Sequence, residues 1–185
     1  AIGLEPHQSI MDFDAEAARE RLLSMPSITS ASIRKIYPNQ LIVELDEKQP
    51  LAIWTVDGVN FAIDADGQRI ASVSVPIMGL PLFIGDGASD DIPQMLNMLQ
   101  SHEVLTDGLV ASSRIGDRRW DLIYDNGVRI MLPETGVAAA MSQATTLIEK
   151  HQIFDRDIAA IDLRVSDFIA IRPVAREDQT TEGSE

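Results

Sequence analysis

The stretch RRWDLIYDNGVRIMLP, residues 118–133, predicts a β-hairpin, and its flanking side chains discriminate between two possible turns. A two-residue loop at Asn126-Gly127 would place the acidic Asp121 opposite Leu132. A three-residue loop at 125–127 instead aligns only apolar pairs across the hairpin: Tyr124 with Val128, Leu122 with Ile130, and Trp120 with Leu132. Because a one-residue slip inverts both faces of a strand, the pattern predicts the three-residue loop, with Gly127 left-handed.

A second hairpin is predicted upstream, in LAIWTVDGVNFAID at residues 51–64. A two-residue Asp57-Gly58 loop is typical of a primed turn, whose twist matches that of the flanking strands. It also aligns apolar residues throughout: Val56 with Val59, Trp54 with Phe61, and Ala52 with Ile63.

Helical patterns occur in three places. Residues 11–26 carry Ala15, Ala18, Leu22 and Met25 at helical spacing, with Asp14 as the expected cap and Pro26 as the stop. Residues 89–103 and 134–154 show similar apolar stripes, and residues 31–50 predict two short strands around Pro38-Asn39. The predicted fold is therefore α+β: a helix plus a β-hairpin, followed by a mainly antiparallel β domain that carries two helices.

The composition excludes several classes of function. The chain has 185 residues and a net charge of −14, with 15 basic residues against 29 acidic ones. Nucleic-acid binding requires clustered Lys and Arg, so the sequence argues against it. The absence of cysteine removes disulfides and thiol chemistry, and leaves the compartment open.

No catalytic, cofactor-binding or metal-binding constellation stands out. The three histidines are scattered singly, and the pairs Asp12/Asp14 and Asp90/Asp91 stand at expected helix starts, where capping is the simpler role. The pair Arg118-Arg119 has two interpretations. Either both arginines are solvated, or one of them is reserved for the carboxylate of a partner, which a planar guanidinium suits.

The stretch IDLRVSDFIAIRP, residues 161–173, predicts a final strand at the edge of the sheet. Ile161, Leu163 and Val165 would face the core, and Arg164 would share the outward face with Phe168. An exposed, partly apolar edge invites pairing with another chain, through about five main-chain hydrogen bonds of roughly 0.5–1.5 kcal/mol each. The alternative is an edge guarded by its own charges or paired within the chain.

Several motifs together resemble the bacterial cell-division family FtsQ/DivIB. These are the helix ending at Met25-Pro26, the segment Ala31-Ser32-Ile33-Arg34-Lys35, Tyr37-Pro38, and Glu47-Lys48-Gln49-Pro50 followed by Ala52 and Trp54. The hairpin at 118–133 and the stretch 161–173 resemble later strands of the family. Ser27 departs from the family's aromatic residue. The relationship has an alphaproteobacterial character.

The resemblance implies a POTRA domain over residues 1–49 that lacks its first strand, an FtsQ-type β domain over 50–173, and a polar tail over 174–185. It also implies a single-pass inner-membrane protein whose membrane helix lies upstream of Ala1 and whose present part faces the periplasm at the division septum.

The resemblance further implies a non-catalytic scaffold without cofactors. The β domain would bind FtsB and FtsL by strand addition, and the POTRA domain would recruit other division proteins. The expected FtsB-binding residues are Arg118, Arg164, Val165, Phe168, Ile169, Ile171 and Arg172. The alternatives are a POTRA-type outer-membrane assembly factor and a carboxylate-based periplasmic hydrolase.

Overall fold

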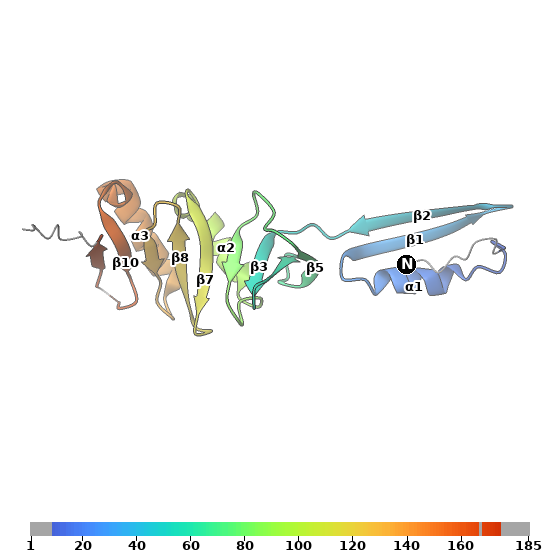
Figure 1. Cartoon of the computed structure of the whole chain (residues 1–185), viewed down its shortest axis with the longest axis horizontal. Helices are drawn as coiled ribbons and strands as arrows, with labels where there is room; N and C mark the ends of the chain where they lie inside the picture. The colour runs from blue at the N-terminus through green and yellow to red at the C-terminus, as the bar shows by residue number, and fades with distance from the viewer. Residues whose placement is uncertain (1–8, 167, 175–185) are drawn as a thin grey trace, which may run out of the picture. The chain divides into compact units, whose positions relative to one another are not determined.

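The computed structural model describes residues 9–166 and 168–174 (Figure 1). The chain divides into two compact units, with the boundary between Leu80 and Pro81. This boundary differs from the one predicted between residues 49 and 50, which remains a prediction. Residue 167 and nearly all of the predicted tail lie outside the described residues.

The first unit begins with the expected helix and hairpin. Helix α1 spans Ala15–Leu23, and the Asp14 carboxylate caps it by accepting hydrogen bonds from the backbone N–H groups of Glu16 and Ala17 at 3.1 and 3.0 Å. Strands β1 (Ile28–Ile36) and β2 (Gln40–Glu47) pair antiparallel. Leu22 of the helix joins Ile28 and Ala31 of β1 in a small apolar core. Both predictions are confirmed.

Three more strands of the first unit form an antiparallel meander: β3 (Ala52–Val56), β4 (Val59–Ile63) and β5 (Arg69–Val73). The register of β3 and β4 is the predicted one, with Trp54 opposite Phe61. Asp57 and Gly58 have φ values of 50° and 74°, as a primed two-residue turn requires.

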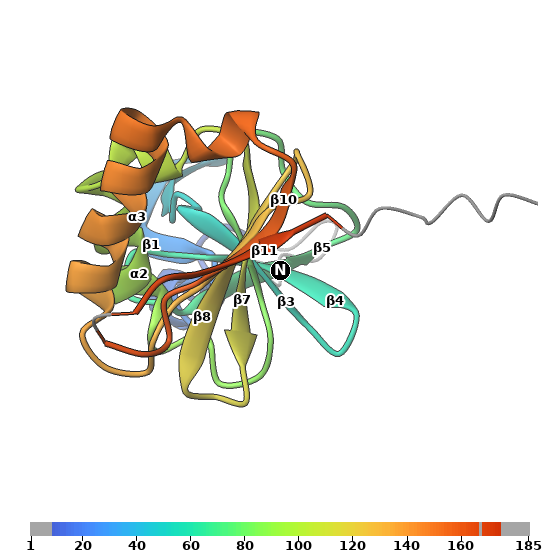
Figure 2. The same ribbon diagram turned by 90° about the vertical axis from the view of Figure 1, so that its left-hand side faces the viewer.

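The described residues of the second unit form six strands in the spatial order β11-β10-β9-β8-β7-β6. Their bounds are β6 Leu82–Ile84, β7 Leu109–Ile115, β8 Arg119–Tyr124, β9 Arg129–Met131, β10 Ile158–Asp162 and β11 Ala170–Pro173. The pairs β6/β7 and β9/β10 are parallel, and the other neighbouring pairs are antiparallel. Helices α2 (Ile92–Gln100) and α3 (Val137–His151) lie on the same face of this sheet (Figure 2). Short 3-10 turns follow them at Glu103–Leu105 and Ile153–Asp155.

The hairpin of β8 and β9 has the predicted three-residue loop. Leu122 lies opposite Ile130, and the backbone N–H of Tyr124 donates to the carbonyl of Val128 at 3.0 Å. Gly127 has a φ of 82°, so the left-handed residue is also where the sequence placed it. Asp91 occupies the N-cap position of α2, as the sequence predicts, but its side chain makes no cap hydrogen bond and its carboxylate pairs with Arg114 at 2.5 Å instead.

The prediction of one continuous strand over residues 161–173 is wrong. The chain leaves the sheet after Asp162 and returns as β11, which runs antiparallel to β10. Val165, expected in the core, is 63% exposed in the connection. Strand β10 therefore lies between β9 and β11 and has no open side, and the sheet edge belongs to β11 instead.

The core of the second unit fills the space between the sheet and its two helices. Alternate residues of β8 (Trp120, Leu122 and Tyr124) are buried on this side. The rings of Trp120 and Phe83 meet edge to face with centroids 5.6 Å apart, and the Tyr124 hydroxyl donates to the Leu105 carbonyl at 3.0 Å. These contacts anchor β8 in the core of the unit.

Substitution of Trp120 tests this packing. Trp120→Ala should lower the free energy of unfolding by about 3–5 kcal/mol, because a buried indole leaves a cavity that the sheet cannot close. Chemical denaturation monitored by circular dichroism measures the change. The exposed Met78, replaced by Ala, is the control that should unfold like the wild type. A Trp120→Ala variant with unchanged stability would contradict the assigned register.

Candidate partner-binding edge

Strand β11 is the last strand of the second unit, and only one of its sides is paired. Its inner side follows β10, with Ile171 opposite Ile161 and Arg172 opposite Ala160. Within residues 9–166 and 168–174, no strand pairs with its outer side. Among these residues the outer backbone groups of β11 have no strand partner, which is the arrangement that strand addition uses.

The inner and outer backbone groups of β11 can be assigned by alternation. The N–H of Val174 donates inward to the Asp157 carbonyl at 3.1 Å, so the N–H groups of Arg172 and Ala170 face β10 as well. Ile171 then presents its N–H and C=O outward. Pro173 occupies a position at which an N–H would face outward. An edge strand tolerates proline at such a position, because no hydrogen bond to the neighbouring strand is lost.

Apolar side chains follow the edge and its approach. Phe168 is 73% exposed and Ile171 is 46% exposed, and they are accompanied by Val165, Ile169 and Val174, all exposed. Five exposed apolar side chains thus fall within ten consecutive positions at and before the edge, a concentration that favours an interaction site. Ile169 also lines a cavity of about 340 Å³ with residues of α3, among them Leu147 and His151.

Arg164 does not occupy the position that the sequence predicted. Its guanidinium donates to both carboxylate oxygens of Asp162, at 2.8 and 2.6 Å, and its backbone N–H donates to the same group at 3.0 Å. The Arg164 hydrogen bonds hold the pKa of Asp162 below its usual value, against the opposing effect of burial. Arg164 and Phe168 are both exposed, but they lie in the connection between strands and share no strand face.

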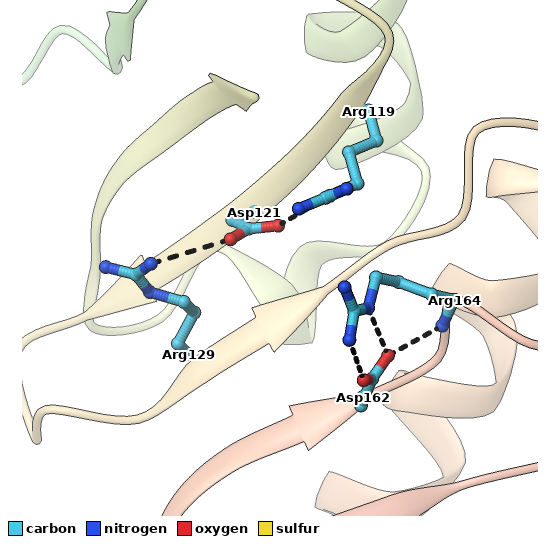
Figure 3. A network of polar contacts seen from close by, with 5 residues as sticks. All are labelled: Arg119, Asp121, Arg129, Asp162 and Arg164. Atoms are coloured by element: carbon cyan, nitrogen blue, oxygen red, sulfur yellow. Dashed lines mark hydrogen bonds and ion pairs between the residues drawn. The ribbon is translucent and has the colours of Figure 1, made fainter. Parts of the chain in front are cut away.

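A second carboxylate lies on the same face of the sheet as Asp162, the face opposite the helices (Figure 3). Asp121 of β8 is buried, with its oxygens 4.0 Å from Arg119 Nε and 3.6 Å from Arg129 Nη1. Burial raises the pKa of Asp121, although Arg129, Arg119 and Arg164 act to lower it. Arg119 and Arg129 thus lie at ion-pair distance from the Asp121 carboxylate, but neither donates a hydrogen bond to it.

Arg118 lies apart from the other predicted site residues. It is exposed before β8 and lines a cavity of about 430 Å³ with Trp120, Arg114 and the start of α3 at Gly136. None of the residues lining this cavity lines the cavity beside Ile169. No ion pair of Arg118 is present among the described residues, and the carboxylates of Asp91 and Glu134 line the same cavity.

The described part of the chain contains no group of three or more His, Asp or Glu side chains arranged to hold a metal ion. Within the same residues, no helix has the length and apolar character needed to cross a bilayer.

Sequence reasoning missed the Arg119–Asp121–Arg129 cluster and the separate strand β11. The alternation of β8 places Asp121 on the face opposite Leu122, but nothing in the sequence indicates which arginines approach it. The break at Ser166 and residue 167 was the available signal for two strands in place of one.

Comparison with known families matches both parts of this architecture. The family described as cell division protein FtsQ/DivIB, C-terminal, matches residues 52–164, and the FtsQ-type POTRA domain matches residues 1–48. Similar curated proteins are the cell division proteins FtsQ of Bartonella bacilliformis (37% identity over 92% of this chain and 56% of that protein), Rhizobium radiobacter (33%, over 99% and 84%) and Caulobacter vibrioides (31%, over 94% and 58%). The chain spans about half the length of most of these relatives.

A solved structure with a similar chain is the major extracytoplasmic domain of the cell division protein DivIB from Geobacillus stearothermophilus, in its trans isomer. The similarity covers 57% of this chain and 97% of that one, at 13% identity and a TM-score of 0.42.

The fold and the matches define an α+β protein in which a POTRA domain precedes a mainly antiparallel β domain with two helices. The chain belongs to the FtsQ/DivIB family of bacterial cell-division proteins. Its relatives are mostly alphaproteobacterial, as the resemblance implied.

The two carboxylates on the helix-free face should respond to pH in opposite ways. The pKa of Asp121 is raised in the folded state, which means that the ionised carboxylate disfavours folding. The free energy of unfolding of the wild type, relative to Asp121→Asn, should therefore fall as pH rises from the usual carboxyl pKa through the raised pKa of the folded state. The lowered pKa of Asp162 gives the reverse. The stabilisation that the ionised Asp162 provides, relative to Asp162→Asn, should be fully present above the usual carboxyl pKa. It should be lost as pH falls through the lowered pKa of the folded state.

Chemical denaturation of both variants and the wild type between pH 3 and pH 8 measures the two slopes, and each variant serves as the matched control for the other. Parallel slopes for the two variants would show that the assigned environments are wrong.

Proposed function

We propose that this chain is a non-catalytic scaffold of the division machinery that binds FtsB, together with FtsL, through a strand added to the outer edge of β11. The full-length protein would be anchored in the inner membrane, with this part in the periplasm at the septum. Membership of the FtsQ/DivIB family supports the divisome role. The observation that supports the site is that no strand of the described residues pairs with the outer side of β11, at and before which several exposed apolar side chains lie.

The length of β11 limits what the backbone alone can contribute. β11 has four residues and a proline at its end. It therefore offers fewer outward hydrogen bonds than a strand over 161–173, for which about five are expected at roughly 0.5–1.5 kcal/mol each. Side chains must therefore supply much of the affinity. Phe168, Ile169 and Ile171 can bury apolar surface, and Arg172 can pair with an acid. Val165 and Arg164 would contribute at the approach to the edge.

Arg118 is proposed as a separate contact. Its exposed guanidinium lines a cavity distinct from that of Ile169, so a partner that reaches it must extend beyond the strand docked on β11. A carboxylate is the chemical group that this side chain fits.

The POTRA part is proposed to recruit other division proteins. The tip of its hairpin exposes Ile36 and Tyr37, and Leu45 is exposed on β2, which supports a contact surface separate from β11. An outer-membrane assembly factor is the alternative for a POTRA protein, but the match to an FtsQ-type domain favours the division role.

A hydrolase would need two carboxyl groups converging in a cleft. Asp121 and Asp162 share one face of the sheet. However, each has an arginine at ion-pair distance, and neither lines the cavities beside Ile169 or Arg118. No observation favours catalysis at this pair over the scaffold role.

Substitution at Ile171 tests strand addition. Ile171→Pro removes the outward N–H and leaves the inward ladder to β10 intact, so binding to the periplasmic part of FtsB with FtsL should weaken about tenfold or more. Isothermal titration calorimetry measures the affinity, and circular dichroism should show an unchanged fold.

The control is Ile171→Val, which keeps the N–H and most of the side chain and should bind within about twofold of the wild type. If Ile171→Pro binds as tightly as Ile171→Val, docking along β11 is disproved.

A further inference from the structure

The register of the second unit places the side chains of β11 at the ends of two cross-strand rows. On the helix-covered face, one row runs Leu122, Ile130, Ile161, Ile171. The first three are fully buried and Ile171, at the open end, is partly exposed. A strand added outside β11 would place its next side chain at the end of this apolar row.

The neighbouring row lies on the opposite, helix-free face. It runs Ile123, Arg129, Ala160, Arg172. The small Ala160 separates the two arginines, and Arg172 stands at the open end. The same added strand would therefore place one of its side chains directly beside a guanidinium.

The charges around Arg172 leave it without an acid. Arg129 has Asp121 at 3.6 Å, and Arg164 holds Asp162 at 2.6 Å. No carboxylate of the described residues forms an ion pair with Arg172, although the chain as a whole carries a net charge of −14. The carboxylates that strands β8 and β10 place on this face, Asp121 and Asp162, already have an arginine, so the position beside Arg172 favours a negative group from outside.

We propose, building on the strand-addition function, that the docked partner strand carries an Asp or Glu beside Arg172 on the helix-free face. An apolar residue next to it in the strand sits beside Ile171 on the helix-covered face. Successive residues of a strand point to opposite faces, so the two rows require this acidic–apolar alternation. The partner is recognised by an adjacent acidic and apolar pair placed at the centre of the docked segment.

This arrangement gives the two rows different roles. The apolar side chain extends a buried row and contributes affinity through burial. The carboxylate pairs with an exposed arginine across the new strand boundary, so its contribution is modest and falls with ionic strength. Because a one-residue shift would place the acid against Ile171, the pair also fixes the register of the partner strand.

Charge reversal at Arg172 tests the inference. Arg172→Glu should weaken binding of the periplasmic FtsB–FtsL pair about five- to tenfold at low salt, because an attractive cross-strand pair becomes repulsive. The difference from the wild type should shrink at high salt. Arg21→Glu, which makes the same change on the exposed side of α1, is the matched control and should bind like the wild type.

A second arm uses the partner. Single Asp→Lys or Glu→Lys substitutions along the docked FtsB segment should include one that weakens binding to the wild type and restores binding to Arg172→Glu. If Arg172→Glu binds like the wild type, or if no such substitution restores it, the acidic position beside Arg172 is wrong.

The Ile171→Pro variant separates this result from the proposed function. Loss of binding by Ile171→Pro with full binding by Arg172→Glu overturns only the acidic–apolar pattern. Full binding by both variants overturns strand addition itself.

Discussion

Among the residues that the structure describes, strand β11 is hydrogen-bonded along one side only, and the account of the binding edge depends on this constraint. A strand has backbone donors and acceptors along both sides, and those left unpaired must meet water or another chain. Here the chain turns back after Asp162 and lays β11 along β10. This turn closes β10 between two neighbours and moves the open row of backbone groups to a short strand with exposed apolar side chains.

The sheet of the second unit also has two chemically different faces. The helix-covered face holds the apolar core, whereas the opposite face carries arginines and two aspartates in alternating rows (Figure 3). Because each strand contributes side chains to both faces, any strand added to β11 must match both chemistries at once. This requirement makes recognition by a strand edge selective although its main-chain hydrogen bonds carry no sequence information.

The local parts of the fold could be predicted from the sequence because local chemistry determines them. Asp57-Gly58 and Gly127 specify their turns, and the apolar alignment across each loop determines the register of both hairpins. Asp14 specifies the start of α1. The family could be recognised from the same segments.

The last strand could not be predicted because its apolar residues continue past a turn. Ile161 and Leu163 alternate as a strand should, and Phe168 to Ile171 resume an apolar pattern. The break at Ser166 and residue 167 indicates two segments, but nothing local shows that the second segment folds back on the first. The cluster around Asp121 depends on Arg129, which β9 brings beside it, and pairing between strands decides that contact. The predicted binding residues from Arg164 to Arg172 do lie at or beside the edge, whereas Arg118 lies at a separate cavity.

Amide hydrogen exchange along β11, with and without the periplasmic FtsB–FtsL pair, measures the central claim most directly. The account predicts that the Ile171 amide exchanges quickly in the chain alone and becomes protected when the partner binds. The Arg172 amide, which faces β10, should be protected in both states. An Ile171 amide already protected in the chain alone, or one whose exchange the bound partner leaves unchanged, would contradict the account.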